Sequence, residues 1–323
     1  MVRPLRLVYC GTPDFAVPTL HALLAAGHEI ALVITQPDRP VGRKQTMAAP
    51  AVKMHAQQLG LSVEQPEKIR RNEALQQRLE QLAPDAMVVV AYGRILPEWM
   101  LRLPRLGCIN LHGSLLPRHR GAAPIQWALA MGDAVTGNTT MLLDEGLDTG
   151  PILLQQMMPI APEHTAVELF SLLAEAGAPL MVETLAGLAN GTIAPQRQDE
   201  SKATVARLLE REDGRMDFAA YTATQLWNRW RGFQPWPGAF TTWQGKKLIA
   251  HRVRPAEQAG AAVAGRVMAV DQRLLVACAA GTWLEMEELQ MEGRNRVPAK
   301  EFLRGTTVSA ETRFGDAASF SEV

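Results

Sequence analysis

The chain has 323 residues, of which 47% are hydrophobic and 20% charged, and its formal net charge is zero. This length exceeds the size at which one hydrophobic core usually stops growing, so two domains are expected, and the average composition excludes a disordered or fibrous chain. The neutral balance excludes the strongly basic class of general nucleic-acid binders, and three widely spaced cysteines exclude a disulfide framework.

The first 190 residues alternate between short apolar runs and helical patterns. Strands are predicted over 5–10, 29–35, 86–91, 108–111 and 139–143, and helices over 16–26, 51–59, 72–83, 124–131 and 166–190. This alternation predicts an α/β fold with a Rossmann-like, mostly parallel sheet and helices on both faces. The first loop, 11–15, has one glycine where a dinucleotide fingerprint needs three, so no nicotinamide or flavin cofactor is expected.

The composition changes after a polar, proline-containing segment. A linker is predicted over 191–206, between a catalytic domain at 1–190 and a C-terminal domain at 207–323. Short Val- and Leu-rich runs in the second domain are typical of a small, OB-like β-barrel. The N-terminus lacks a signal-peptide pattern and no uninterrupted apolar run reaches the length of a membrane span, so a cytoplasmic protein without a membrane partner is expected.

The end of the strand at 108–111 carries the most informative polar pair. Asn110 and His112 are two residues apart, so on a continuing strand their side chains project from one face. In open parallel sheets, ligands bind beyond the carboxyl ends of the strands. A lone histidine there is more often a structural hydrogen-bonding group. Beside an amide donor, however, it can stabilise an oxyanion and move a proton, as acyl transfer requires.

Two further residues bear on this hypothesis. Asp148 follows the strand that ends near 143, although an Asp before a glycine turn is commonly an Asx-turn residue. Cys108 shares the strand face of Asn110 and His112, so a Cys/His/Asn nucleophile is an alternative. Consecutive positions on one strand face orient a thiol and an imidazole poorly, which favours a small buried cysteine.

Several segments resemble the methionyl-tRNA formyltransferase family: 11–16, 36–40, 88–93, 106–110 and 112–126, with 146–150 at the matching spacing and 233–237 a weaker match. The resemblance implies transfer of the formyl group of 10-formyltetrahydrofolate to the α-amino group of methionyl initiator tRNA, without a metal. It also implies that Asn110, His112 and Asp148 are catalytic. The implied folate-binding residues are Ser114, Leu115, Leu116, Pro117 and Gly121.

A basic loop at 38–44 is the predicted contact with tRNA. Its guanidinium groups can reach phosphates and base edges, although a charged loop is often only solvated. In the family this loop enters the acceptor-stem groove, and Arg43 matches its key arginine. The segment 44–47 has fewer basic residues than the family's lysine-rich loops, so a weaker contact, or one shifted to the second domain, is expected. The predicted tRNA-binding residues are Arg39, Arg43, Lys44, Lys246 and Lys247.

Some assignments stay open at this point. Arg118, His119 and Arg120 flank the folate signature and are candidates to meet the cofactor or the terminal adenosine. Basic clusters in the second domain, including Arg252, Arg254 and Arg296, either face RNA or are neutral surface decoration. A formyl-folate-dependent transferase or hydrolase acting on a small-molecule amine or water is an alternative function. An inactive RNA-binding module is another. A monomer is expected.

Overall fold

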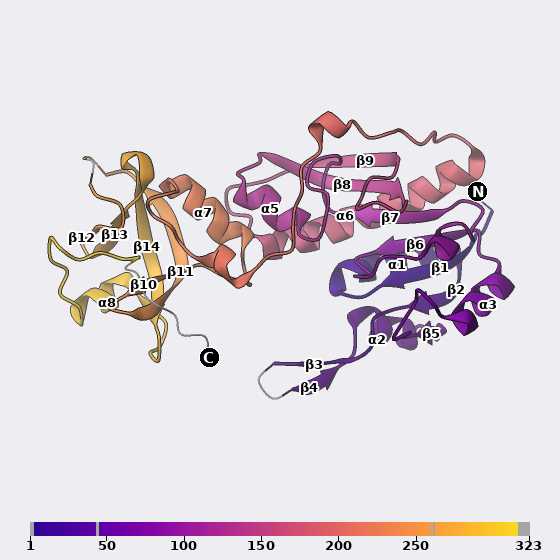
Figure 1. The fold of residues 1–323 in the computed structure, drawn as a ribbon, viewed down its shortest axis with the longest axis horizontal. Helices are drawn as coiled ribbons and strands as arrows, with labels where there is room; N and C mark the ends of the chain where they lie inside the picture. Colours follow the sequence, from indigo (N-terminus) through magenta and orange to yellow (C-terminus); the bar gives the residue numbers. More distant parts are fainter. Residues whose placement is uncertain (1–2, 43–44, 259, 261, 316–323) are drawn as a thin grey trace. The chain divides into compact units, whose positions relative to one another are not determined.

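The computed structural model describes residues 3–42, 45–258, 260 and 262–315 (Figure 1). The contacts within the chain divide it into two compact units. Unit 1 comprises Met1–Pro124, Val135–Pro159 and Leu169–Arg207. Unit 2 comprises Ile125–Ala134, Ile160–Glu168 and Leu208–Val323, so two short segments from the first half of the chain belong to it.

Unit 1 is built on a seven-stranded sheet in the order β5-β2-β1-β6-β7-β8-β9. Neighbouring strands from β5 to β7 pair in parallel, whereas β8 pairs antiparallel with both β7 and β9. The expected Rossmann-like, mostly parallel sheet is thus confirmed. The strands are β1 (Arg6–Gly11), β2 (Glu29–Ile34), β5 (Val63–Glu64), β6 (Ala86–Val90), β7 (Cys108–His112), β8 (Val135–Leu142) and β9 (Ile152–Pro159).

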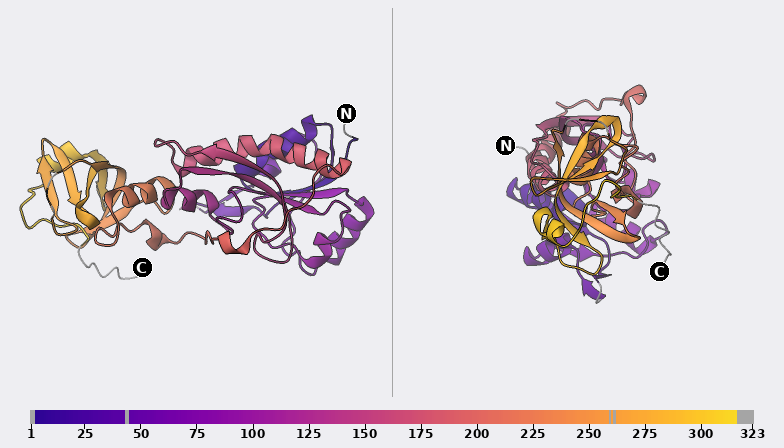
Figure 2. Two further views of the ribbon diagram at one scale, coloured as in Figure 1. Left: turned by 90° about the horizontal axis from the view of Figure 1, so that it is seen from above. Right: turned by 90° about the vertical axis from the view of Figure 1, so that its left-hand side faces the viewer.

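Helices lie on both faces of this sheet, with α6 along one face and α3 on the other (Figures 1 and 2). Local chemistry sets their ends. The Asn72 side chain accepts a hydrogen bond from the Leu75 amide at 3.0 Å and begins α3, and Ala83, in the left-handed conformation, ends it. The helices are η1 (Asp14–Ala16), α1 (Val17–Ala25), α2 (Ala51–Gln58), α3 (Glu73–Leu82), α4 (Glu98–Leu101), α6 (Ala166–Asn190) and η2 (Glu200–Lys202).

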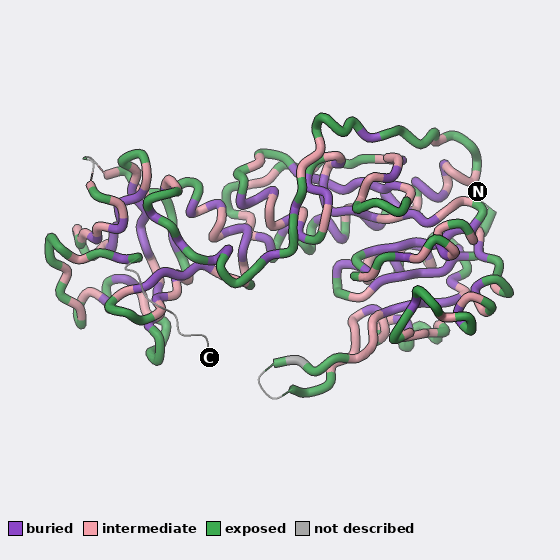
Figure 3. Tube along the Cα trace, in the orientation of Figure 1, coloured by how far each residue is buried: buried purple, intermediate pink, exposed green. Residues whose placement is uncertain are grey.

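Side chains of the central strands alternate between two cores. The whole of β6 is buried (Figure 3). Met87 and Val89 of β6 and Cys108 of β7 belong to the cluster that includes Leu75 and Leu79 of α3. The intervening positions face the other side of the sheet, where α6 packs. This alternation follows from the two-residue period of a strand and fixes which face each residue of β7 presents.

The helix α6 is long and apolar enough, by length and composition, to cross a membrane, and half of its most apolar window is buried inside the protein. Its contacts within unit 1 are those of a core helix. Thr184 Oγ1 lies 2.8 Å from Thr140 Oγ1 on β8, and the Asn138 amide donates to the Leu173 carbonyl at 2.8 Å. A Cβ at Gly177 would lie 2.6 Å from the Leu111 side chain, so this glycine lets α6 approach the sheet closely.

The segment predicted as a basic loop contains a β-hairpin, which corrects that expectation. Strand β3 (Arg39–Val41) pairs antiparallel with β4 (Thr46–Ala48). At its base, Asp38 accepts hydrogen bonds from Gln65 at 2.6 Å and Lys53 at 2.8 Å, and these lower the pKa of the Asp38 carboxyl. Strands of three residues are too short to show a recognisable alternation of apolar and polar residues, so the sequence here resembled a loop.

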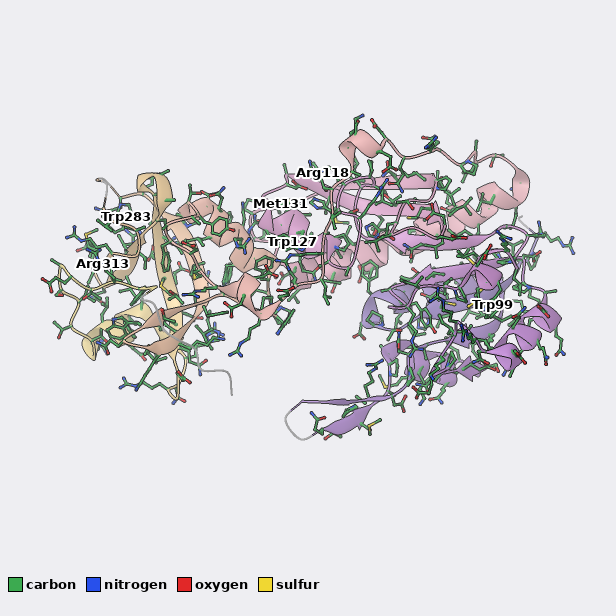
Figure 4. The ribbon with its side chains drawn as sticks, viewed as in Figure 1. Trp99, Arg118, Trp127, Met131, Trp283 and Arg313 are labelled. Carbon is green, nitrogen blue, oxygen red and sulfur yellow. The ribbon has the colours of Figure 1, made fainter. Side chains whose placement is uncertain are left out.

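Unit 2 contains an antiparallel half-barrel sheet in the order β10-β11-β14-β13-β12, with β15 paired to β14. Two register shifts in β11, between Ala250 and Val253, bend the strand around an apolar core. Trp283 of β14, which is labelled in Figure 4, donates its indole hydrogen to the Gly260 carbonyl at 2.9 Å. The strands are β10 (Phe240–Trp243), β11 (Lys246–Ala256), β12 (Val267–Val270), β13 (Arg273–Ala277), β14 (Trp283–Met291) and β15 (Val297–Pro298).

The helices of unit 2 pack against one another and against this sheet. A Cβ at Gly232 would lie 2.5 Å from the Gln126 carbonyl oxygen, which shows how closely α7 approaches α5. The buried Arg231 guanidinium donates to the carbonyls of Ala161, Pro162 and His164, each at 3.3 Å. The helices are α5 (Pro124–Ala130), η3 (Arg211–Gly214), α7 (Ala223–Gly232), η4 (Ala279–Gly281) and α8 (Ala299–Arg304).

Candidate active site

Strand β7 presents Asn110 and His112 on one face of the unit 1 sheet. Asn110 pairs with Val89 on one side, and His112 pairs with Thr139 on the other. Cys108, two residues before Asn110, belongs to the core cluster that includes Leu75 and Leu79 of α3, so the two polar residues continue the same strand face beyond that core. The sequence predicted that Asn110 and His112 share this face. Both residues lie toward the carboxyl end of β7, where the strand leaves the core.

The imidazole of His112 is held in one orientation. Its side chain is 6% exposed, and Nε2 lies 2.9 Å from the His119 carbonyl oxygen. Because a carbonyl oxygen only accepts, Nε2 carries a hydrogen and donates it. Nδ1 lies 3.7 Å from Oδ2 of Asp148. Nδ1 is therefore the nitrogen that can take up and release a proton.

Asp148 is brought to His112 by an unusual backbone conformation. It is a non-glycine residue with φ of 53°, in the left-handed region. Its Oδ2 accepts a hydrogen bond from the Gly121 amide at 2.8 Å, and its side chain is 14% exposed. Left-handed backbone at such a residue costs about 1 kcal/mol or more and persists where the surroundings hold it. The carboxylate is thus aimed between the β7 end and the loop around Gly121.

Asn110 differs from these two residues because its amide is uncommitted. The residue is half-buried, and no hydrogen bond of its side chain occurs within the described ranges. An amide group on a rigid strand that is not engaged by the protein is available to donate to a ligand. The structure therefore supplies one free donor, one imidazole nitrogen and one carboxylate from β7 and the loop after β8.

Hydrogen bonds within the turn after β7, and from β8 and β9, fix its shape. The turn contains four of the predicted folate-binding residues. The buried Ser114 donates its hydroxyl hydrogen to the Arg118 carbonyl at 2.7 Å. Thr139 of β8 donates to the Ser114 carbonyl at 2.7 Å, and Gln155 of β9 donates to the Leu116 carbonyl at 2.9 Å. Leu116 is buried, whereas Leu115 and Pro117 are half-buried. Folate contact by these four residues stays a prediction.

Gly121, the fifth predicted folate-binding residue, has a structural requirement for glycine. Its φ is 114°, and a Cβ there would lie 2.7 Å from the Ala206 carbonyl oxygen. Ala206 cannot move freely, because its amide donates to the Arg120 carbonyl at 2.7 Å. Gly121 therefore places its amide hydrogen on the Asp148 carboxylate, a role that the sequence did not predict.

The three residues that flank the folate signature occupy different environments. His119 is buried, with φ of 59°, and its carbonyl orients His112. Arg120 is buried too, and it bonds to Gln198 and Glu200. The Arg118 side chain is exposed (Figure 4). Arg120 had been a candidate to meet the cofactor or the adenosine, but its guanidinium faces protein groups instead.

The nucleophilic-cysteine alternative conflicts with the state of Cys108. Its thiol is buried and donates to the Met100 carbonyl at 3.4 Å. Burial raises the pKa of Cys108 to about 12, so the thiolate that would act as nucleophile is not formed at neutral pH. Cys108 is a core residue.

The predicted tRNA-binding residues are unequal in exposure. Arg39 on β3 and Lys246 on β11 are exposed. The Lys247 ammonium lies 4.0 Å from the centroid of the Phe240 ring, and burial lowers its pKa. Arg43 and Lys44 lie outside the described residues. Three arginines of the second-domain clusters have acidic partners, which limits their availability to RNA: Arg252 with Glu287, Arg254 with Glu285 and Arg296 with Glu288.

An open hollow of about 480 Å³ lies between α4 and the start of the loop that leads to Asp148. Its lining includes Glu98, Arg102 and Asp144, and none of the three predicted catalytic residues. Across the described ranges, no group of three or more His, Cys, Asp or Glu side chains is arranged to hold a metal ion.

Comparison with known proteins identifies both halves of the chain. Residues 5–185 match the family model described as formyl transferase, and residues 208–307 match the formyl transferase C-terminal domain. The chain is 61% identical to a methionyl-tRNA formyltransferase of Acidobacterium capsulatum, over 96% of this chain and 100% of that relative. It is 51% identical to a methionyl-tRNA formyltransferase of Koribacter versatilis, over 97% of this chain and 99% of that relative.

Solved structures share the fold at low sequence identity. An N-formyltransferase of Helicobacter canadensis, in complex with folinic acid and dTDP-3-aminofucose, superimposes with a TM-score of 0.63 at 17% identity, covering 89% of this chain and 99% of that one. HypX of Aquifex aeolicus in complex with tetrahydrofolic acid gives a TM-score of 0.60 at 15% identity, covering 93% of this chain and 47% of that one. These two similarities concern the fold alone.

Proposed function

The chain belongs to the formyl transferase family, and from this premise we propose that it transfers the formyl group of 10-formyltetrahydrofolate to the α-amino group of methionyl-tRNA. The product is N-formylmethionyl-tRNA, used in translation initiation. Relatives that are 51% and 61% identical over nearly their whole length carry this activity in their names. The observation that carries the proposal is the approach of His112 Nδ1 to Asp148 Oδ2 at 3.7 Å, on the strand face that also presents the uncommitted Asn110 amide.

The proposed reaction is a direct attack by the neutral α-amine on the formyl carbon. A bond forms between the amine nitrogen and that carbon, and the carbonyl oxygen becomes an oxyanion. Asn110 and the Nδ1 hydrogen of a protonated His112 donate to this oxyanion; a donor of this kind typically contributes about 2.7 to 4 kcal/mol. The bond from the carbon to N10 of the folate then breaks. One proton passes from the amine to N10, and Asp148 stabilises the positive imidazole during this transfer.

The hydrogen bond of Nε2 supports the assignment of this role to Nδ1. Nε2 is committed to the His119 carbonyl, so the ring cannot rotate without losing that hydrogen bond inside a buried site. The fixed ring keeps Nδ1 near Asp148, at 3.7 Å, which is beyond hydrogen-bond distance and leaves the Nδ1 hydrogen available to the oxyanion. Preorganised donors of this type need no rearrangement when charge develops, which is the source of their catalytic effect.

The test is formylation of methionyl initiator tRNA by the purified chain with 10-formyltetrahydrofolate. Formation of N-formylmethionyl-tRNA is expected, and no product at excess enzyme would refute the proposal. His112→Ala is expected to lower kcat by about 10²- to 10⁴-fold. His21→Ala, at an exposed histidine on α1, is the matched control and is expected to retain activity. Near-normal turnover by His112→Ala would refute its catalytic role.

We also propose that tRNA contacts Arg39, Arg43, Lys44, Lys246 and Lys247. We propose further that the sheet of unit 2 forms an OB-like barrel. Two hydrogen bonds support a barrel, because residues 312–315 bond to both ends of the sheet: Val267 N to the Thr312 carbonyl and Gly315 N to the Thr242 carbonyl, each at 2.9 Å. Arg43→Ala is expected to raise KM for tRNA more than KM for folate. Arg71→Ala, at another exposed arginine, is the control. Equal effects on the two KM values would contradict the assignment.

We assign catalysis to residues 1–190 and tRNA binding to the domain at 207–323, in addition to the contacts of Arg39, Arg43 and Lys44, with a linker at 191–206. A monomer is sufficient, since the proposed catalytic residues come from one chain, and light scattering tests this. A cytoplasmic location agrees with the free, buried state of Cys10, Cys108 and Cys278 and with a tRNA substrate.

A further inference from the structure

A buried polar cluster beside the proposed catalytic centre has no role in the mechanism above. Gln198 is 4% exposed and Arg120 is 6% exposed. The Gln198 Nε2 group donates to the Asp148 carbonyl at 2.7 Å and to the Gly150 carbonyl at 2.8 Å. Its Oε1 accepts from Nε and Nη2 of Arg120, at 3.0 and 2.8 Å. One amide thus connects the Asp148 turn to a buried guanidinium.

These contacts allow only one orientation of the Gln198 amide. Its two hydrogens bond to two carbonyl oxygens, and its oxygen bonds to two guanidinium hydrogens. A reversed amide would direct hydrogens at the arginine and its oxygen at the two carbonyls, which loses every bond. Arg120 is itself fixed by Glu200, whose carboxylate accepts from Nη1 at 2.8 Å and Nη2 at 2.9 Å. The cluster is a defined clamp, not a mobile polar patch.

The turn that the clamp holds would not keep its shape unaided. Asp148 has a φ of 53°, an unfavourable conformation for a residue with a Cβ. Gly150, two residues later, leaves no space for a side chain, since a Cβ there would lie 1.8 Å from the Leu142 carbonyl oxygen. Gln198 holds the carbonyls on both sides of Thr149. Together with the Gly121 amide on the carboxylate, this fixes Asp148 by both backbone and side chain.

We propose that Gln198 is a positioning residue for the reaction, holding the 148–150 turn so that the Asp148 carboxylate faces Nδ1 of His112. Arg120 orients the Gln198 amide, and Glu200 anchors Arg120. The inference rests on the proposed function, because it assigns Gln198 an effect through Asp148. A purely structural role for Gln198 would lower stability without changing the turnover of the folded molecules.

The test substitutes Gln198→Glu, which keeps the size and replaces the two donated hydrogens with a carboxylate that repels both carbonyls. We expect kcat to fall by about 10- to 100-fold, as for a small displacement of a catalytic group, while KM for each substrate changes by less than about twofold. The matched control is Gln196→Glu, since Gln196 is exposed on the same segment and pairs with Ile152 through its backbone. If both variants turn over equally, the proposal is overturned.

A double-mutant cycle separates positioning from structure. In an Asp148→Asn background, Gln198→Glu is expected to change kcat by less than about threefold, because the group it positions is already lost. The same 10- to 100-fold loss in both backgrounds would overturn the proposal. If Gln198→Glu does not fold, Gln198→Asn, which retains the amide one methylene shorter, replaces it in the same cycle.

A readout independent of activity distinguishes this inference from the proposed function. Amide hydrogen exchange over 144–151 is expected to be faster in Gln198→Glu than in Gln196→Glu, whichever acceptor the enzyme uses. Unchanged exchange would overturn the inference even if methionyl-tRNA is formylated. Absence of formylation by the unsubstituted chain, with faster exchange in the variant, would refute the proposed function and leave the clamp supported.

Discussion

Replacing Asp148 with Asn tests the proposed centre with a minimal change of shape. The asparagine oxygen can still accept the Gly121 hydrogen bond, so the turn is expected to be retained, and only the charge is lost. At 3.7 Å and an effective dielectric constant of about 20, opposite unit charges interact by about 4.5 kcal/mol. The Asp148 side chain is 14% exposed, and solvent screening reduces this value by roughly half.

A stabilisation of about 2 to 4.5 kcal/mol corresponds to roughly 30- to 2000-fold in rate, so Asp148→Asn is expected to lower kcat by about 10²- to 10³-fold. The assay is single-turnover formylation of methionyl-tRNA at saturating 10-formyltetrahydrofolate, with thermal unfolding measured in parallel. Glu145→Gln, which removes an exposed charge from the same loop, is the control. A kcat within about threefold of the unsubstituted chain, at unchanged thermal stability, would refute the electrostatic reasoning.

Three further outcomes are expected. Gly121→Ala would bring a Cβ to 2.7 Å from the Ala206 carbonyl, so it should cost about 1 to 3 kcal/mol of stability and lower kcat at least about tenfold; an unchanged melting temperature and kcat would contradict this. Cys108→Ala should keep kcat within about threefold, and a hundredfold loss would restore the nucleophile alternative. In unit 2, burial alone would raise the pKa of Glu285, but hydrogen bonds from Arg273 and Arg254 hold it below its ordinary value of 4.5. The charged Glu285 therefore stabilises the fold at pH values above 4.5, and this stabilisation is lost as the pH falls through the pKa of the folded state. Glu285→Gln should lower the free energy of unfolding by about 1 to 3 kcal/mol at pH 7 and much less near pH 3. Denaturant titrations at both pH values test this, and equal effects would contradict it.

The sequence predicted the parallel core of unit 1 because buried strands and their helices leave strong apolar patterns. The predicted helix 166–190 matches α6 (Ala166–Asn190) in full. Strand β9 (Ile152–Pro159) was not predicted, since Gln155 and Gln156 interrupt its apolar run and half of its residues are exposed. Such a strand is defined by its pairing with β8, which local sequence does not express.

The residues of the candidate site also differ in how far the sequence predicted them. The common face of Asn110 and His112 follows from strand geometry, so two residues of sequence were sufficient to predict it. Gln198 could not be predicted, because it lies 50 residues from Asp148 in a polar segment that has the composition of a linker. Its importance comes from burial, and burial of an isolated glutamine depends on how distant segments fold together.

Unit 2 is assembled from three separate segments of the chain, and this has a practical consequence for protein engineering. A fragment that starts at Leu208 would lack 125–134 and 160–168, so the buried Arg231 would lose all three carbonyl acceptors and α7 would lose its partner helix. Chimeras that exchange only the C-terminal part between homologues would inherit mismatched surfaces at these points. A transplantable module therefore has to carry all three pieces of chain, and any natural recombination between the halves would have required matching changes in α5.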